Sequence, residues 1–120
     1  MIDHIGFEVS DLARSAGFYD AVFFALGIRR LVESEHAIAY GIDRPRFWVV
    51  VRGRAPASGW GHVALQANGK AAVDGAYRAG LAGGGVGEGA PGPRPQYGRG
   101  TYSCYLRDPD GLRVEVVSRR

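Results

Sequence analysis

The sequence predicts an α+β protein made of two βαβββ modules that form a curled mixed-sheet cup. Two observations predict this fold: an internal repeat, and hydrophobic periods within each copy that change from two residues to three or four. When His62 is placed over His4, Tyr77 also falls on Tyr19. Such self-similarity is typical of a duplicated structural unit.

Length and composition agree with one duplicated domain. The 120 residues suit a single compact domain, and a hydrophobic content of 46% can supply a core without disulfide bonds. We expect one domain over residues 1–120, with repeats at about 1–53 and 60–120. The single cysteine, Cys104, excludes an intrachain disulfide, and the charged opening residues resemble no targeting segment. These features predict a cytoplasmic protein.

The first repeat reads as one strand, one helix and three strands. Apolar and polar residues alternate over Ile2–Val9, as in a half-buried strand. Ser10 and Asp11 then begin a helix, whose apolar residues recur every three or four positions until Gly27 ends it. The remaining strands are expected at Ile28–Glu33, Ala37–Ile42 and Arg46–Arg52.

The second repeat shows the same order of strands and helix, except that one strand is not recognisable. We expect a strand at His62–Ala67, a helix at Lys70–Ala82 and final strands at Thr101–Arg107 and Leu112–Ser118. The strand between the helix and these final strands has no clear pattern. Because glycine and proline are concentrated in Gly87–Gly100, we predict a mobile loop there that can cover a site.

The charge of the chain favours an anionic small molecule as partner. Its formal net charge is +3, and arginines, which suit planar contacts with carboxylate or phosphonate groups, supply most of the positive charge. The arginines are scattered and no nucleic-acid-binding motif connects them, so we expect no nucleic-acid partner. No apolar run approaches the ~20 residues that span a bilayer, so we expect no membrane partner either.

Three residues of metal-binding type occupy related positions. His4 and His62 are matched across the repeat on the first strands, and Glu115 lies on the last strand. Each residue alone would read as a solvated or hydrogen-bonded side chain. Because repeat symmetry brings the first strands together, we predict that the three side chains hold a divalent ion such as Mn, Fe, Ni or Zn, with coordination positions left open.

Three segments resemble the signature strands of the vicinal-oxygen-chelate superfamily. They are Ile2–Ile5, Gly61–Leu65 and Asp108–Glu115. This superfamily includes glyoxalase I, extradiol dioxygenases, fosfomycin-modifying thiol transferases and bleomycin-resistance proteins. The resemblance implies paired βαβββ modules around a metal, commonly in a homodimer, and it implies that His4, His62 and Glu115 are the ligands.

Departures from the family patterns narrow the expected activity. Glyoxalase I has a further metal-binding acid on its fourth strand, but Arg46–Arg52 contains none. Fosfomycin enzymes carry a threonine two residues after the first histidine, where this chain has Gly6. Extradiol dioxygenases are generally longer and use further histidines, whereas only His36 remains here. Bleomycin-resistance proteins usually have an acidic groove, and this chain is basic.

Two functions remain open from the sequence. The first is a glyoxalase-like, metal-dependent enzyme, a lyase, isomerase or thiol transferase, acting on a small, oxygen-rich anion. The alternative is a non-catalytic protein of the antibiotic-resistance type that sequesters a small molecule.

Further side chains share faces with the expected ligands. We predict that Glu8 and Tyr105 take part in catalysis with Glu115, as a base and as a hydrogen-bond donor to an oxyanion. The predicted substrate contacts are Trp48, Ser103, Arg99 and Gln66. Cys104 falls on the opposite face from Tyr105, so we expect a buried thiol without a catalytic role.

Overall fold

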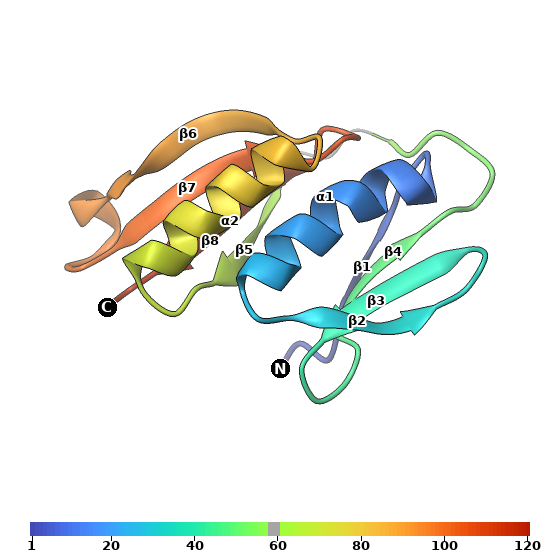
Figure 1. Cartoon of the computed structure of the whole chain (residues 1–120), viewed down its shortest axis with the longest axis horizontal. Coiled ribbons are helices and arrows are strands. Elements are labelled where there is room, and N and C mark those ends of the chain that lie inside the picture. Colours follow the sequence, from blue (N-terminus) through green and yellow to red (C-terminus); the bar gives the residue numbers. More distant parts are fainter. Residues whose placement is uncertain (58–60) are drawn as a thin grey trace.

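A computed structural model of the chain describes residues 1–57 and 61–120. The elements are β1 (Ile5–Glu8), α1 (Leu12–Ala25), β2 (Arg29–Glu33), β3 (Ala37–Gly41), β4 (Phe47–Val50), β5 (His62–Gln66), α2 (Lys70–Ala82), β6 (Val86–Pro93), the 3-10 turn η1 (Pro95–Tyr97), β7 (Tyr102–Arg107) and β8 (Arg113–Ser118). The predicted α+β fold with two βαβββ modules is confirmed (Figure 1). None of the helices in the described part is long and apolar enough to cross a membrane.

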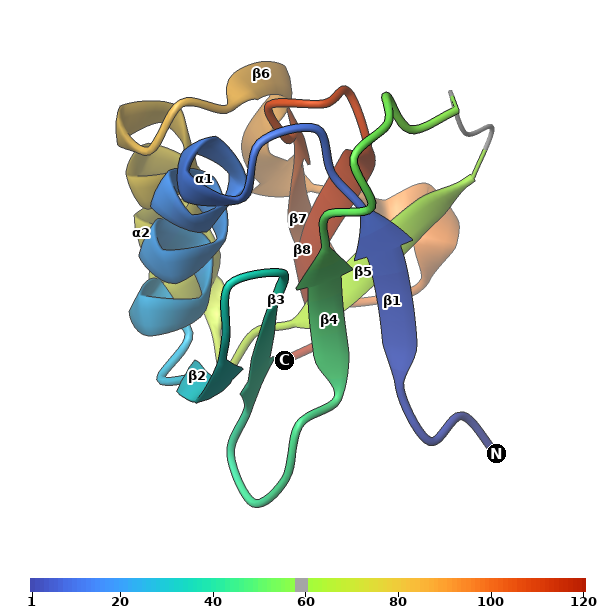
Figure 2. The same cartoon turned by 90° about the vertical axis from the view of Figure 1, so that its right-hand side faces the viewer.

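Each module forms its own four-stranded sheet. The strand orders are β1-β4-β3-β2 and β5-β8-β7-β6, and the sheets do not close into a barrel. In each sheet the first strand runs parallel to the last strand of its module, and the other pairs are antiparallel. Helices α1 and α2 pack together on one side of the sheets, which leaves the opposite faces uncovered (Figure 2).

The core lies between the helices and the covered faces of the sheets. Phe23 of α1 stacks on Tyr40 with ring centroids 4.6 Å apart, and Tyr19 packs against Phe47 at 5.1 Å. Where the helices meet, Gly83 allows a close approach, because a Cβ there would lie 2.5 Å from the carbonyl oxygen of Gly17. The aromatic core therefore occupies the covered side of the sheets, and the side chains of the opposite faces lie outside it.

The glycine-rich segment contains a strand where the sequence predicted a loop. β6 pairs antiparallel with β7, and its register shifts between Gly87 and Gly89 and again between Gly89 and Gly92. The prediction of a mobile loop over Gly87–Gly100 is thus wrong for the part in β6. An edge strand tolerates proline and bulges because one side of its backbone needs no partner, and such a strand shows no side-chain alternation.

A buried carboxylate joins the two modules at the turn between β7 and β8. Asp108 accepts a hydrogen bond at Oδ2 from the hydroxyl of Tyr19 at 2.6 Å. Its Oδ1 accepts two more from the backbone N–H groups of Asp110 at 2.9 Å and Leu112 at 2.8 Å. Burial, together with the adjacent carboxylate, raises the pKa of Tyr19, so the phenol stays the donor. One side chain thus shapes this turn and anchors it to α1.

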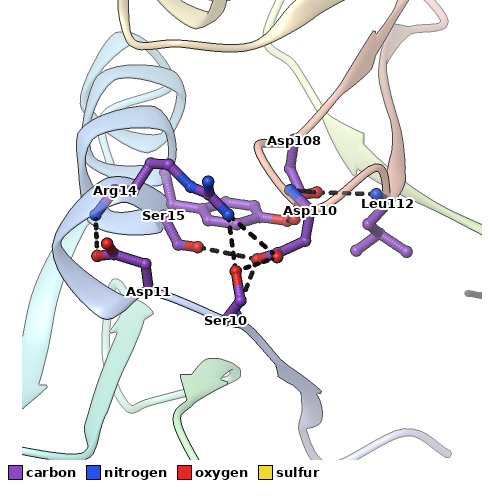
Figure 3. Close-up of polar contacts among 8 residues, drawn as sticks. Ser10, Asp11, Arg14, Ser15, Asp108, Asp110 and Leu112 are labelled. Carbon is purple, nitrogen blue, oxygen red and sulfur yellow. Dashed lines mark hydrogen bonds and ion pairs between the residues drawn. The ribbon is translucent and has the colours of Figure 1, made fainter. Parts of the chain in front are cut away.

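Asp110 of the same turn reaches the start of α1 (Figure 3). Its carboxylate accepts hydrogen bonds from the hydroxyl and backbone N–H of Ser10 and lies 3.3 Å from a guanidinium nitrogen of Arg14. Asp11 caps the helix by accepting the N–H of Arg14 at 2.9 Å, which confirms the predicted helix start. The second module is therefore bound to the first at the N-terminus of α1.

Replacing Tyr19 with phenylalanine removes the hydroxyl that binds Asp108. Because a buried acceptor left without its partner costs about 1–3 kcal/mol, we expect a loss of that size in the free energy of unfolding. Urea titration followed by circular dichroism measures it. Tyr102→Phe is the matched control, since the Tyr102 hydroxyl also binds an aspartate, Asp74, at 2.6 Å, but that hydrogen bond is only partly buried. Equal losses in both variants would contradict a special role for Asp108.

Candidate functional site

The uncovered face of the second sheet carries a cluster of polar side chains. Strand pairing places His62 opposite Arg113 and Tyr105 opposite Glu115. Residues at alternate positions of a strand share a face, so these four side chains point away from α2. The residues between them, such as Val114, are buried in the core.

His62 and Glu115 are in direct contact on this face. The Nε2 atom of His62 lies 3.4 Å from Oε1 of Glu115, and the side chains are 46% and 11% exposed. Imidazole nitrogen and carboxylate oxygen are both good ligands for first-row divalent metals. A protonated imidazole beside a carboxylate would give the same contact without a metal. The types of atom and their closeness would allow His62 and Glu115 to serve as two ligands of a metal ion.

His4 lies apart from this pair, just before β1 of the first module. Its Nδ1 is 2.9 Å from Oδ1 of Asp3, and its side chain is 57% exposed. His4 and His62 both line a cleft of about 960 Å³ between the modules. Over residues 1–57 and 61–120, no three histidine, cysteine, aspartate or glutamate side chains gather as metal ligands would. One copy of the chain thus brings together two of the three predicted ligands.

Tyr105 lies beside the His62–Glu115 pair. Its ring centroid is 6.4 Å from that of His62, and the guanidinium carbon of Arg113 is 4.2 Å from the tyrosine ring. Burial, assisted by the charge of Glu115, raises the pKa of Tyr105. The phenol therefore keeps its proton at neutral pH and can donate a hydrogen bond, as its predicted role requires.

Glu8 lies on the uncovered face of the first sheet and is neutralised there. Arg54 donates two hydrogen bonds to its carboxylate, at 2.9 and 2.8 Å, and Arg52 lies 3.9 Å away. The hydrogen bonds from Arg54 lower the pKa of Glu8. A carboxylate in this state is a weak proton acceptor, so a basic role requires that Arg54 first move away.

Two predicted substrate contacts lie on the same sheet as the pair. Ser103 shares a face with Tyr105, is fully buried, and its hydroxyl has no hydrogen-bond partner among the residues described. Gln66 lies at the end of β5 on the face of His62 and is exposed. Ser103 is thus an available donor at the site, and Gln66 lies at its edge.

The other two predicted contacts lie outside the second sheet's polar face. Trp48 is on β4 and lines the cleft between the modules together with His4 and His62. Arg99 lies in the exposed turn that follows η1, and no hydrogen bond or ion pair joins its described side chain to the cluster. Trp48 therefore faces the space between the modules, whereas Arg99 is outside the cluster.

Arg113 belongs to the cluster but was missed as a site residue from the sequence. Strand alternation already placed it on the face of Glu115, two residues away. A strand arginine ordinarily reads as a solvated surface group, however. Only the structure shows that Arg113 packs on Tyr105 inside the polar face.

The two-module fold matches that of a known protein superfamily. A family model, the Glyoxalase/Bleomycin resistance protein/Dioxygenase superfamily, matches residues 1–116. The chain therefore belongs to this superfamily.

Solved structures of similar proteins agree with this assignment. A glyoxalase/bleomycin resistance protein from Albidiferax ferrireducens is 32% identical, with a TM-score of 0.88 and 98% of each chain covered. Lactoylglutathione lyase from Agrobacterium tumefaciens is 26% identical, with a TM-score of 0.69 over 98% of this chain and 92% of that one. A glyoxalase I variant from Zea mays, 24% identical with a TM-score of 0.74, shares the fold over 97% of this chain and 45% of its own. None of the curated proteins compared with the chain matches it.

Cys104 lies on the opposite side of β7, in contact with α2. Its sulfur is 4.0 Å from the carbonyl oxygen of Val73, and the residue is fully buried. Burial raises the pKa of the Cys104 thiol to about 11. The thiol is therefore not suited to act as a nucleophile.

This environment predicts that the Cys104 thiol is inert in the native protein. At pH 8 only about one thiol in a thousand is ionised when the pKa is near 11, and the core also blocks access. We expect a chromogenic disulfide reagent to label about one thiol per chain in urea and to label the native protein far more slowly. Rapid labelling of the native protein would contradict this.

Proposed function

We propose that the protein is a glyoxalase-like, metal-dependent enzyme acting on a small, anionic, oxygen-rich molecule, as a lyase, isomerase or thiol transferase. The observation that carries the proposal is the contact of His62 with Glu115 at 3.4 Å on a face shared with Tyr105. Membership of the superfamily supports it, as does the likeness to a lactoylglutathione lyase.

In this proposal His62 and Glu115 hold a divalent ion, and His4 is the third ligand. Two imidazoles and one carboxylate are a common ligand set for Mn, Fe, Ni or Zn. A bound ion would polarise adjacent substrate oxygens and stabilise negative charge on them. The low exposure of Glu115 supports this role, because a carboxylate largely removed from water binds a cation more strongly.

The surrounding side chains supply orientation and hydrogen bonds. Tyr105, protonated at neutral pH, donates to a substrate oxygen that gains negative charge. The buried Ser103 hydroxyl offers a second donor on the same face. Because both groups are held by a strand, they need little reorganisation when substrate binds.

We further propose that a homodimer completes the site. Within one copy, the described residues place no third ligand of the predicted kind beside His62 and Glu115. Both sheets also leave a face uncovered, where a second copy can pack (Figure 2). In such a dimer the second copy contributes His4.

The first test is the metal content of tag-free protein loaded with Mn, Fe, Ni or Zn. We expect about one ion per chain in the wild type and at least about tenfold weaker binding in Glu115→Gln and His62→Ala. His36→Ala is the control, since His36 is exposed and lies outside the cluster. A wild type that takes up none of the four ions, yet binds a small molecule in the presence of chelator, would favour sequestration over catalysis.

A mixing experiment tests the shared site. His4→Ala and Glu115→Ala should each bind metal poorly alone. If His4 comes from the second copy, a mixed dimer has one site with both residues intact and one site with both replaced. Metal binding should therefore return after the two variants are unfolded and refolded together. Native mass spectrometry detects the mixed dimer and its metal. A mixture that forms mixed dimers but stays metal-free would contradict a site shared between copies.

A further inference from the structure

Among the residues that the structure describes, Arg113 forms no ion pair with an anionic side chain of the polar face. Across β7 and β8 it lies opposite Arg107, so two like charges face each other. The charge of Arg107 is paired, because its Nε donates a hydrogen bond to Glu88 at 2.7 Å, and its Nη1 donates another to the carbonyl oxygen of Gly111 at 2.9 Å. In the described part of the chain, the Nε of Arg113 is buried and has no hydrogen-bond partner.

Tyr105 holds the guanidinium of Arg113 in place. The guanidinium carbon lies 4.2 Å from the ring centroid, within the range of a cation–π contact. Such a contact uses the face of the guanidinium and leaves its N–H edge free to bind two oxygens of an anion. The arrangement orients the donors of Arg113 without satisfying them.

A buried donor without a partner is costly, so it calls for an explanation, and a bound anion that accepts its hydrogen bond is one. The fully buried hydroxyl of Ser103 shares this face and has no hydrogen-bond partner of good geometry among the residues described, although it lies near enough to Tyr105 to lower the pKa of that phenol slightly against the larger effect of burial. The guanidinium of Arg94 adds positive charge 5.9 Å from the Tyr105 ring. The carboxylate of Glu115 is already engaged by His62. The face therefore has a surplus of donors and positive charge.

We propose that Arg113 anchors an oxyanion subsite, which binds a carboxylate or phosphonate group of the ligand beside His62 and Glu115. Tyr105 positions its guanidinium, and Arg94 strengthens the positive field. The inference rests on the proposed function for the identity of the site, and it names the chemical group that this site recognises. Arg113 would be a residue for substrate binding and specificity.

The test is a titration of the full-length, isotope-labelled protein with acetate, methylphosphonate and, as a neutral control, acetamide. The Nε–H resonance of Arg113, identified by its loss in Arg113→Lys, reports binding directly by NMR. We expect a saturable shift with one or both anions and none with acetamide. The ratio of the two anion affinities shows whether the subsite prefers a planar carboxylate or a tetrahedral phosphonate.

Variants test the geometry of the subsite. Arg113→Gln should weaken anion binding about tenfold or more, because it removes a charge-assisted, two-point contact. Arg113→Lys keeps the charge without the planar fork and should fall in between. Arg107→Gln is the matched control, since it removes an arginine already paired with Glu88, and it should bind as the wild type does. The residual anion shift in these variants is followed on the backbone N–H of Glu115.

Several outcomes would overturn the subsite. They are an affinity unchanged in Arg113→Gln, equal weakening in Arg107→Gln, or shifts that stay linear without saturation. Repeating the titration with chelator and with Zn(II) separates this inference from the proposed function. Saturable binding through Arg113 in a protein that takes up no metal would sustain the subsite and refute the metal enzyme. Metal uptake without anion binding at Arg113 would refute the subsite and leave the proposed metal enzyme standing.

Discussion

The placement of the site depends on the buried carboxylate of Asp108. It binds the hydroxyl of Tyr19 in the first module and two backbone N–H groups in the turn of the second. This turn leads directly into β8, which carries Arg113 and Glu115. The interaction therefore fixes the strand of the functional cluster relative to the helix layer. An aspartate suits this position because one small side chain satisfies three donors away from water.

The two sides of the sheets carry different kinds of side chains. One side is closed by packed helices and an aromatic core, so it can stay dry and rigid. On the other side of the second sheet, the Ser103 hydroxyl and the Nε of Arg113 are buried without a hydrogen-bond partner among the residues described, beside the contact of His62 with Glu115. A metal, an anionic ligand and a second copy are partners that would satisfy these groups together.

Local patterns predicted most of the fold, and they predicted the site only in part. Alternation and capping, as at Asp11, depend on neighbouring residues and were confirmed. The segment Gly87–Gly100 was misjudged, because an edge strand rich in glycine is held by backbone pairing that no side-chain pattern reveals. The separation of His4 from the pair depends on how modules meet, and the pairing of Glu8 with Arg54 depends on an irregular segment. Neither can be read from periodicity.

The most direct test of a metal-assisted anion site on the second sheet is anomalous X-ray diffraction from crystals loaded with Mn(II) or Zn(II) alone. We expect one strong anomalous peak beside Nε2 of His62 and the carboxylate of Glu115, with His4 of a second copy completing the ligand set. Loaded crystals with no peak at this pair, or with peaks only at surface histidines such as His36, would contradict it.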